Sequence, residues 1–156
     1  MSIEPLRTDA PAIVYIDFKS PYAYLAVAPT RELERELGVE FDWRPFVLDI
    51  PSYLGSARLG KRGEVVEQNR SAEQWSGVKY AYYDCRRYAR LRGQTIRGTE
   101  KIWDTNLIAT AMLWARQQGY AAVHRLIDTV YPPFWVRELD VEDEAVVASV
   151  LDSIDL

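Results

Sequence analysis

Apolar and polar positions in the first third of the chain predict a strand, a helix and a second strand. Residues 12–18 are mainly apolar, β-branched or aromatic, which is typical of a mostly buried strand. Ser20 is a favoured helix N-cap, and proline, a favoured first helical residue, follows it. We therefore expect a helix over residues 21–37, ended by Gly38, with a kink or an early break at Pro29.

A second strand is predicted over residues 39–47, where apolar and polar residues alternate. Strand, helix and strand in this order form a βαβ unit, which implies parallel pairing and a right-handed crossover. Residues 48–70 contain three glycines and a proline and are predicted to form a long loop. The chain thus divides into a flexible lead-in at 1–11, an α/β part with the loop at 12–70, and a helical part at 71–156.

The remainder of the chain has helical periodicity. Ser71 and Gln74 fit a capping box, and apolar residues then recur at steps of three and four until Gly93. Pro132 and Pro133 are expected to interrupt a later helix. After the helix that ends before Gly93, three more helices are expected, over residues 106–118, 121–131 and 142–154.

Composition narrows the class of protein. With 156 residues, 48% of them hydrophobic and 27% charged, the chain fits one soluble globular domain. The formal charge of −4 argues against nucleic acid as a partner, and no apolar run is long enough for a membrane span. One cysteine allows no internal disulfide and no signal peptide is recognised, so a cytoplasmic location is expected.

The chain offers few residues for metal or nucleotide chemistry. Cys85 lies on the apolar face of its predicted helix and is expected to be a buried hydrophobe. His124 has no cysteine or second histidine at ligand spacing, so no metal site is expected. Nucleotide binding has no support either, because the sequence has no glycine-rich phosphate loop.

The junction between the first strand and the first helix is the strongest candidate site. Backbone N–H groups and the positive end of the helix dipole gather at Ser20, which adds a hydroxyl donor. These donors favour a thiolate, whereas an unperturbed thiol with a pKa of ~8.5 is mostly protonated at neutral pH. The Ser-Pro pair also has a purely local interpretation, as a cap followed by the first helical residue.

Several segments resemble one family in the same order. Residues 17–26 (Asp-Phe-Lys-Ser-Pro-Tyr-Ala-Tyr-Leu-Ala) are similar to the opening motif of 2-hydroxychromene-2-carboxylate isomerases and kappa-class glutathione transferases, which are thioredoxin-fold relatives of DsbA. The resemblance covers about residues 12–156 and implies a thioredoxin-like βαβ unit followed by an all-helical insertion domain. The other similar segments lie at residues 43–46, 79–89, 105–107 and 134–135.

In that family a C-terminal β-β-α part with a cis-proline loop follows the helical insertion. This chain has no proline after Pro133, so we expect that part to be missing and the site to be incomplete. Three explanations stay open: a shortened chain, which we favour, a natural truncation without activity, and a homodimer that rebuilds the sheet through its partner.

The resemblance also implies roles for individual residues. Ser20 would donate a hydrogen bond to the sulfur of glutathione, which serves as thiol cofactor or cosubstrate. The other glutathione-binding residues would be Pro21, Tyr22, Asn69 and Lys79, and a small aromatic substrate would contact Trp103 and Asn106. A solvated or capping role stays open for Asn69, Lys79 and Asn106, and a role in the core for Trp103.

The leading hypothesis is a glutathione-dependent isomerase or transferase acting on an aromatic, conjugated substrate. The thiolate would add to a double bond, permit rotation about it and leave again. A thiol–disulfide oxidoreductase is the alternative by fold analogy, although the family's C-x-x-C pair is absent because serine and alanine occupy positions 20 and 23. A non-catalytic remnant that acts through protein contacts is a further alternative.

Overall fold

The computed structural model describes residues 7–156, so residues 1–6 of the predicted lead-in lie outside the described part. Within that part no helix is long and apolar enough to cross a membrane. The elements, in chain order, are β1 (Ile13–Ile16), α1 (Pro21–Leu37), β2 (Asp42–Pro45), α2 (Ile50–Leu54), β3 (Ser56–Leu59), β4 (Val65–Asn69), α3 (Ala72–Leu91), α4 (Asn106–Gln117), α5 (Tyr120–Trp135) and α6 (Glu144–Ser153).

Strands β1 and β2 pair in parallel around α1, which confirms the predicted βαβ unit. Helix α1 starts after the N-cap Ser20 and ends at Gly38, whose φ of 66° is a left-handed conformation that glycine adopts without strain. The early break expected at Pro29 is wrong, because α1 is continuous over all 17 residues. Its buried side chains, among them Leu25 and Val27, hold the helix against the sheet despite the missing backbone donor.

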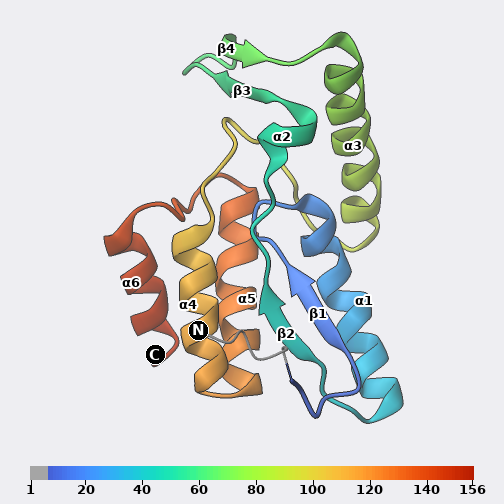
Figure 1. Ribbon diagram of the computed structural model, residues 1–156, viewed down its shortest axis with the longest axis vertical. Helices are drawn as coiled ribbons and strands as arrows, with labels where there is room; N and C mark the ends of the chain where they lie inside the picture. The colour runs from blue at the N-terminus through green and yellow to red at the C-terminus, as the bar shows by residue number, and fades with distance from the viewer. Residues whose placement is uncertain (1–6) are drawn as a thin grey trace.

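The long loop predicted over residues 48–70 is wrong as well. It contains α2 and an antiparallel hairpin of β3 and β4, which lies at the top of the molecule in Figure 1, beyond the end of β2. Pro51 stands in the first turn of α2 and Gly55 ends it, so residues taken as loop signals are helix-end residues. Gly55 has a φ of 62°, and a Cβ atom there would lie 2.0 Å from the backbone oxygen of Asn69. Only glycine therefore allows β4 to approach α2 this closely.

The helical part begins with α3, whose capping box is formed as predicted. Ser71 Oγ accepts from the backbone N–H of Gln74, and the Gln74 side chain accepts from the N–H of Ser71. Helix α5 runs through Pro132 and Pro133, so the predicted interruption is wrong. Each proline removes one backbone N–H donor from the last turns, and the burial of Phe134 and Trp135 holds the helix together despite these losses.

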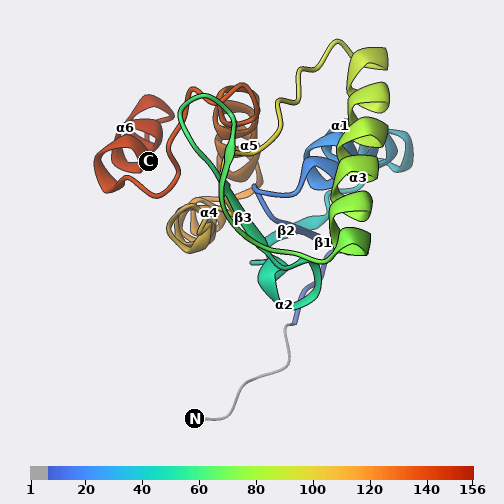
Figure 2. The same ribbon diagram turned by 90° about the horizontal axis from the view of Figure 1, so that it is seen from above.

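The β1–β2 sheet lies between two helical groups. Figures 1 and 2 show α1 and α3 on one side and α4, α5 and α6 on the other. At the centre of the core, the ring of Tyr131 lies 4.9 Å from the ring of Phe18 and stacks on Tyr24 at 4.9 Å. The other large side chains that are fully buried here include Ile108, Met112, Leu126, Ile127 and Val130.

Candidate functional site

The turn between β1 and α1 is organised by a buried carboxylate. Asp17 is 4% exposed, and its two oxygens accept hydrogen bonds from the Lys19 N–H at 3.1 Å, the Leu48 N–H at 2.7 Å and Thr105 Oγ1 at 2.7 Å. The Tyr131 hydroxyl donates to the backbone oxygen of Asp17 at 3.2 Å. These bonds join the turn to the segment after β2 and to both α4 and α5, so the start of α1 is held from several sides.

Ser20 serves as the N-cap of α1, and its hydroxyl can still donate a hydrogen bond. Its Oγ accepts from the backbone N–H of Ala23 at 3.2 Å, and its backbone has the extended conformation of an N-cap. A hydroxyl that accepts through a lone pair still carries its own O–H donor. The cap and a donor to an anion are thus compatible roles of one side chain.

Ser20 lines a cavity of about 210 Å³ between the start of α1, α2, the middle of α3 and the segment over residues 99–103. These elements surround the upper end of α1 in Figure 1. Most of the side chains around this cavity, called here the serine cavity, are apolar or aromatic, as a site for a flat organic molecule requires. Its lining includes Ile50, Tyr53, Leu54, Val78, Ala81, Tyr82, Ile102 and Trp103, with Lys19, Arg70 and Lys101 as its basic residues, of which Lys101 is paired with Glu142.

Lys19 brings a positive charge to the wall of the serine cavity. It is only 8% exposed, and its Nζ lies 3.5 Å from Asp17 Oδ2, farther than the 2.7–2.9 Å typical of a charged hydrogen bond. Asp17 balances the charge, but its oxygens are already occupied by other donors. The ammonium group therefore retains donor capacity next to Ser20.

Tyr22 ties the start of α1 to α3. Its hydroxyl donates to Asp84 Oδ2 at 2.9 Å, and the Ala81 backbone oxygen lies 3.3 Å from the same hydroxyl. Burial, and next the hydrogen bond to Asp84, raises the pKa of Tyr22 to about 12, so the phenol stays protonated at neutral pH. Both Tyr22 and its neighbour Pro21 line the serine cavity.

The two polar residues expected to bind glutathione lie elsewhere. Asn69 is exposed at the end of β4 and does not line the serine cavity, whereas its neighbour Arg70 does. Lys79 is exposed on α3 and lines an adjoining cavity of about 240 Å³, called here the arginine cavity. Arg70, Val78, Tyr82 and Thr99 line both cavities, which are therefore neighbours.

Of the two predicted substrate-binding residues, only Trp103 lines the serine cavity, although both line a shallow hollow beside Lys19. Trp103 lines the serine cavity and also packs edge-on against Phe134 at 5.6 Å, so it serves the core and the cavity together. Asn106 is exposed and lines a different, shallow hollow beside Lys19. Its N–H and its amide donate to Asp104 Oδ1 at 2.9 and 2.7 Å, so Asp104 satisfies the first turn of α4.

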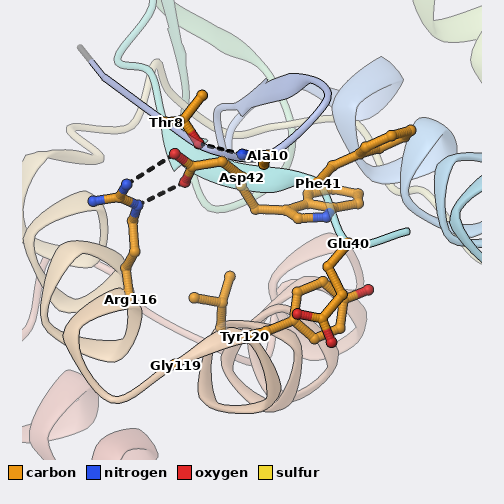
Figure 3. Close-up of a pocket in the computed structure, with 10 residues that line it drawn as sticks. Thr8, Ala10, Glu40, Phe41, Asp42, Arg116, Gly119 and Tyr120 are labelled. Carbon is orange, nitrogen blue, oxygen red and sulfur yellow. Dashed lines mark hydrogen bonds and ion pairs between the residues drawn. The ribbon is translucent and has the colours of Figure 1, made fainter. Parts of the chain in front are cut away.

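A larger cavity of about 490 Å³ lies beside β2 and the turn between α4 and α5, as Figure 3 shows. Arg116 points at Asp42 there and donates to its two oxygens at 2.7 and 2.8 Å. This guanidinium holds the pKa of Asp42 well below its usual range, helped by a second hydrogen bond from Arg44. Arg116 and Asp42 thus neutralise each other, which favours a structural role for this pair.

Neither thiol nor metal chemistry is provided by the described side chains themselves. Cys85 is fully buried, as predicted, and burial raises the pKa of its thiol, which makes it a poor nucleophile. Over residues 7–156, no group of three or more His, Cys, Asp or Glu side chains is placed to hold a metal ion. Thiol chemistry at Ser20 would therefore require a thiol supplied by a bound molecule.

Sequence reasoning did not single out Asp17, Lys19 or Arg70 as functional residues. A charged residue directly after a buried strand was a usable signal for Asp17, since only a partnered carboxylate is stable there. Nothing in the local sequence shows that Lys19 is buried, or that Arg70 lies between two cavities. Both facts depend on elements that are distant along the chain.

Comparison with curated proteins finds no match. The family comparison does, and its extent agrees with the geometry: a βαβ unit whose helix starts beside a cavity, followed by a helical part. The matched region covers residues 12–156, from the start of β1 through α6. The protein therefore belongs to the family of the DSBA-like thioredoxin domain, within a superfamily of thiol–disulfide oxidoreductases and isomerases.

Proposed function

We propose that the protein is a glutathione-dependent isomerase that acts on a small, conjugated aromatic substrate in the serine cavity. The observation that carries this proposal is the Ser20 hydroxyl, which caps α1 and lines a mostly apolar cavity. This combination suits an anionic sulfur beside a flat organic molecule. A transferase reaction, in which the sulfur stays attached to the substrate, uses the same arrangement.

Glutathione, when bound, would supply the thiol that adds reversibly to a conjugated double bond, so that the bond can rotate before the thiol leaves. The residues of the chain have separate tasks in this reaction. The Ser20 hydroxyl, the Tyr22 N–H and the dipole of α1 lower the pKa of a thiol held there, since the N–H groups of Ala23 and Tyr24 already donate to Ser20. Lys19 stabilises the negative charge that an unsaturated carbonyl compound gains during the addition. The apolar walls exclude water and orient the ring.

A dithiol exchange reaction is the second candidate because the family includes thiol–disulfide oxidoreductases. The residues of this chain argue against it. Serine and alanine stand at positions 20 and 23, and the one cysteine, Cys85, is buried. We therefore expect no insulin-reduction activity. Dependence on the thiol form of glutathione further favours a reducing compartment, such as the cytoplasm.

The test compares three substitutions of Ser20 that separate capping from donation to sulfur. Ser20→Asn keeps both a cap and a donor, Ser20→Asp keeps the cap but places a negative charge beside the thiolate, and Ser20→Ala removes both. Calorimetry would give the affinity for glutathione, and thiolate absorbance against pH would give the pKa of the bound thiol. Turnover would be assayed with 2-hydroxychromene-2-carboxylate.

We expect Ser20→Asn to retain most of the activity and Ser20→Asp to lose it by about 100-fold, the size typical of losing one oxyanion-type donor. Ser20→Asp should nevertheless unfold at the wild-type temperature, because the cap is kept. Absence of glutathione binding at millimolar concentration by the wild-type protein, or equal turnover by Ser20→Asp, would refute the proposal.

A further inference from the structure

Arg70 stands between the serine cavity and the arginine cavity and lines both. It directly follows β4 and precedes the cap of α3, so the hairpin and the helix fix its backbone from both sides. Its guanidinium carbon lies 5.0 Å from the ring centre of Trp75, a cation–π distance. Trp75 is itself oriented by its indole N–H, which donates to Gln68 Oε1 at 2.7 Å.

The charge of Arg70 is not balanced by a neighbour. Among residues 7–156 no carboxylate lies within ion-pair distance of its guanidinium, and its Nε is buried without a hydrogen-bond acceptor. Burial lowers the pKa of Arg70, as expected for a cation that has lost water without gaining an anion. A buried unpaired donor of this kind is costly to the fold and is seldom kept without a use.

The arginine cavity also has more positively than negatively charged side chains in its lining. Arg86 and Lys79 line it together with Arg70, and neither forms an ion pair with the described residues. Arg86 lies over the ring of Tyr82 at 5.5 Å and donates through Nε to the Ile96 backbone oxygen at 3.0 Å. The acidic residue of the cavity, Glu100, is engaged by Arg137 at 3.2 Å. Three cations thus share a cavity with one occupied carboxylate.

We propose that Arg70, supported by Arg86 and Lys79, binds a carboxylate group of the ligand whose reacting end lies at Ser20. The guanidinium provides a planar pair of donors that matches a carboxylate, and the aromatic walls of Trp75 and Tyr82 suit a flat or extended ligand. The inference rests on the proposed function for the position of the reacting end. The carboxylate itself belongs either to the thiol cofactor or to the substrate.

The experiment measures binding by calorimetry and by the quenching of tryptophan fluorescence, to which Trp75 contributes. S-methylglutathione probes the cofactor's carboxylates without a free thiol, and cinnamate probes an aromatic carboxylate. Arg70→Gln should weaken binding of at least one probe by about ten- to a hundredfold, the range for a hydrogen bond to a charged group, and Arg70→Lys should weaken it less. Arg87, an exposed arginine of α3, lines neither cavity, so Arg87→Gln is the control and should change nothing.

A second measurement changes the ligand instead of the protein, so its result does not depend on whether a variant folds. The methyl esters of both probes should bind wild-type protein as weakly as the acids bind Arg70→Gln. Loss with S-methylglutathione alone assigns the carboxylate to the cofactor, and loss with cinnamate alone assigns it to the substrate. If esters and acids bind alike, or if Arg70→Gln binds both acids as wild type does, the inference is overturned.

The outcomes also separate this inference from the proposed function. If the affinity for glutathione changes in the Ser20 variants as expected, but no affinity changes in Arg70→Gln, the carboxylate site alone is refuted. Dependence on Arg70 without dependence on Ser20 would refute the thiol site alone.

Discussion

The two sides of the serine cavity are built differently. On one side, the β1–α1 junction is anchored by buried groups: Asp17 accepts three hydrogen bonds, and Phe18 is 1% exposed. On the other side, which we call the outer wall, α2 has no buried residue and every residue of β4 is exposed. The outer wall consists of α2, the β3–β4 hairpin and the first half of α3.

This difference assigns rigidity and adaptability to separate parts of the molecule. A site that activates a sulfur must hold its donors in fixed positions, and the packed junction does so. A wall that recognises the rest of a ligand benefits from small adjustments, which weakly packed segments permit at low cost. The following predictions test whether the two sides differ in stability as their packing implies.

The largest effect is expected at the junction itself. Asp17→Asn leaves Lys19 buried without its carboxylate and removes an acceptor from either Leu48 or Thr105. We expect the free energy of unfolding to fall by about 3–5 kcal/mol, as when a buried ion pair loses one partner. Chemical denaturation followed by far-ultraviolet circular dichroism would measure this loss.

The matched control lies in the outer wall, where Arg58 and Glu67 form an exposed ion pair at 3.4 Å. Glu67→Gln should change the free energy of unfolding by less than about 0.5 kcal/mol. A loss at Glu67 as large as that at Asp17 would show that the hairpin is as important to the fold as the junction.

A second, smaller effect is expected when the pH is lowered, at the contact between Arg31 of α1 and His124 of α5. His124 Nδ1 accepts from Arg31 Nε at 2.7 Å, and burial, followed by the Arg31 charge, lowers the pKa of His124 to about 4. Between pH ~6.5 and 4, His124 is therefore protonated in the unfolded chain and neutral in the folded chain. The contribution of neutral His124 to the free energy of unfolding should be complete above pH ~6.5. It should decrease by on the order of 2 kcal/mol as the pH drops through this window.

His124→Gln is the control, because glutamine can still accept from Arg31 but does not titrate. Denaturation curves measured from neutral to acidic pH should lose this component of the pH dependence in the variant. An unchanged slope would mean that His124 is protonated in the folded protein, and the Arg31 contact would then be wrong.

The smallest effect is expected at the start of α3, in the outer wall. Ser71→Ala removes half of the capping box and should destabilise this helix end by about 1 kcal/mol. Because the wall is weakly packed, the loss should appear as faster hydrogen exchange in the first turn of α3, with little change in global unfolding. Ser76→Ala, at an exposed position inside the same helix, should leave exchange unchanged or slower. Equal losses in local and global stability would mean that wall and core unfold together.

The same contrast explains what could be predicted from the sequence. The junction depends on consecutive residues, so the strand, the cap at Ser20 and the helix ending at Gly38 were all predictable and are confirmed. The hairpin depends on a contact between Gly55 and the backbone of Asn69, residues whose proximity no local pattern shows. Strand β4 also lacks an alternating apolar face, because all of its residues are exposed.

Elsewhere tertiary packing overrode a local rule. Pro132 and Pro133 normally end a helix, yet the buried Phe134 and Trp135 extend α5 past them. For the candidate site, the sequence indicated Ser20 and its neighbours Pro21 and Tyr22, all of which line one cavity. The unpaired charge of Arg70 was not predictable, since it depends on which carboxylates the fold brings near.

The burial of Cys85 has a practical consequence for work with reactive substrates. Conjugated carbonyl compounds alkylate accessible thiols, and this chain has a single cysteine, which has no exposed surface. The folded protein should therefore resist self-inactivation by the very compounds it is proposed to isomerise. For the same reason, a Ser20→Cys variant would carry one accessible thiol, so a fluorescent label or a cross-linker could be attached at the mouth of the cavity alone.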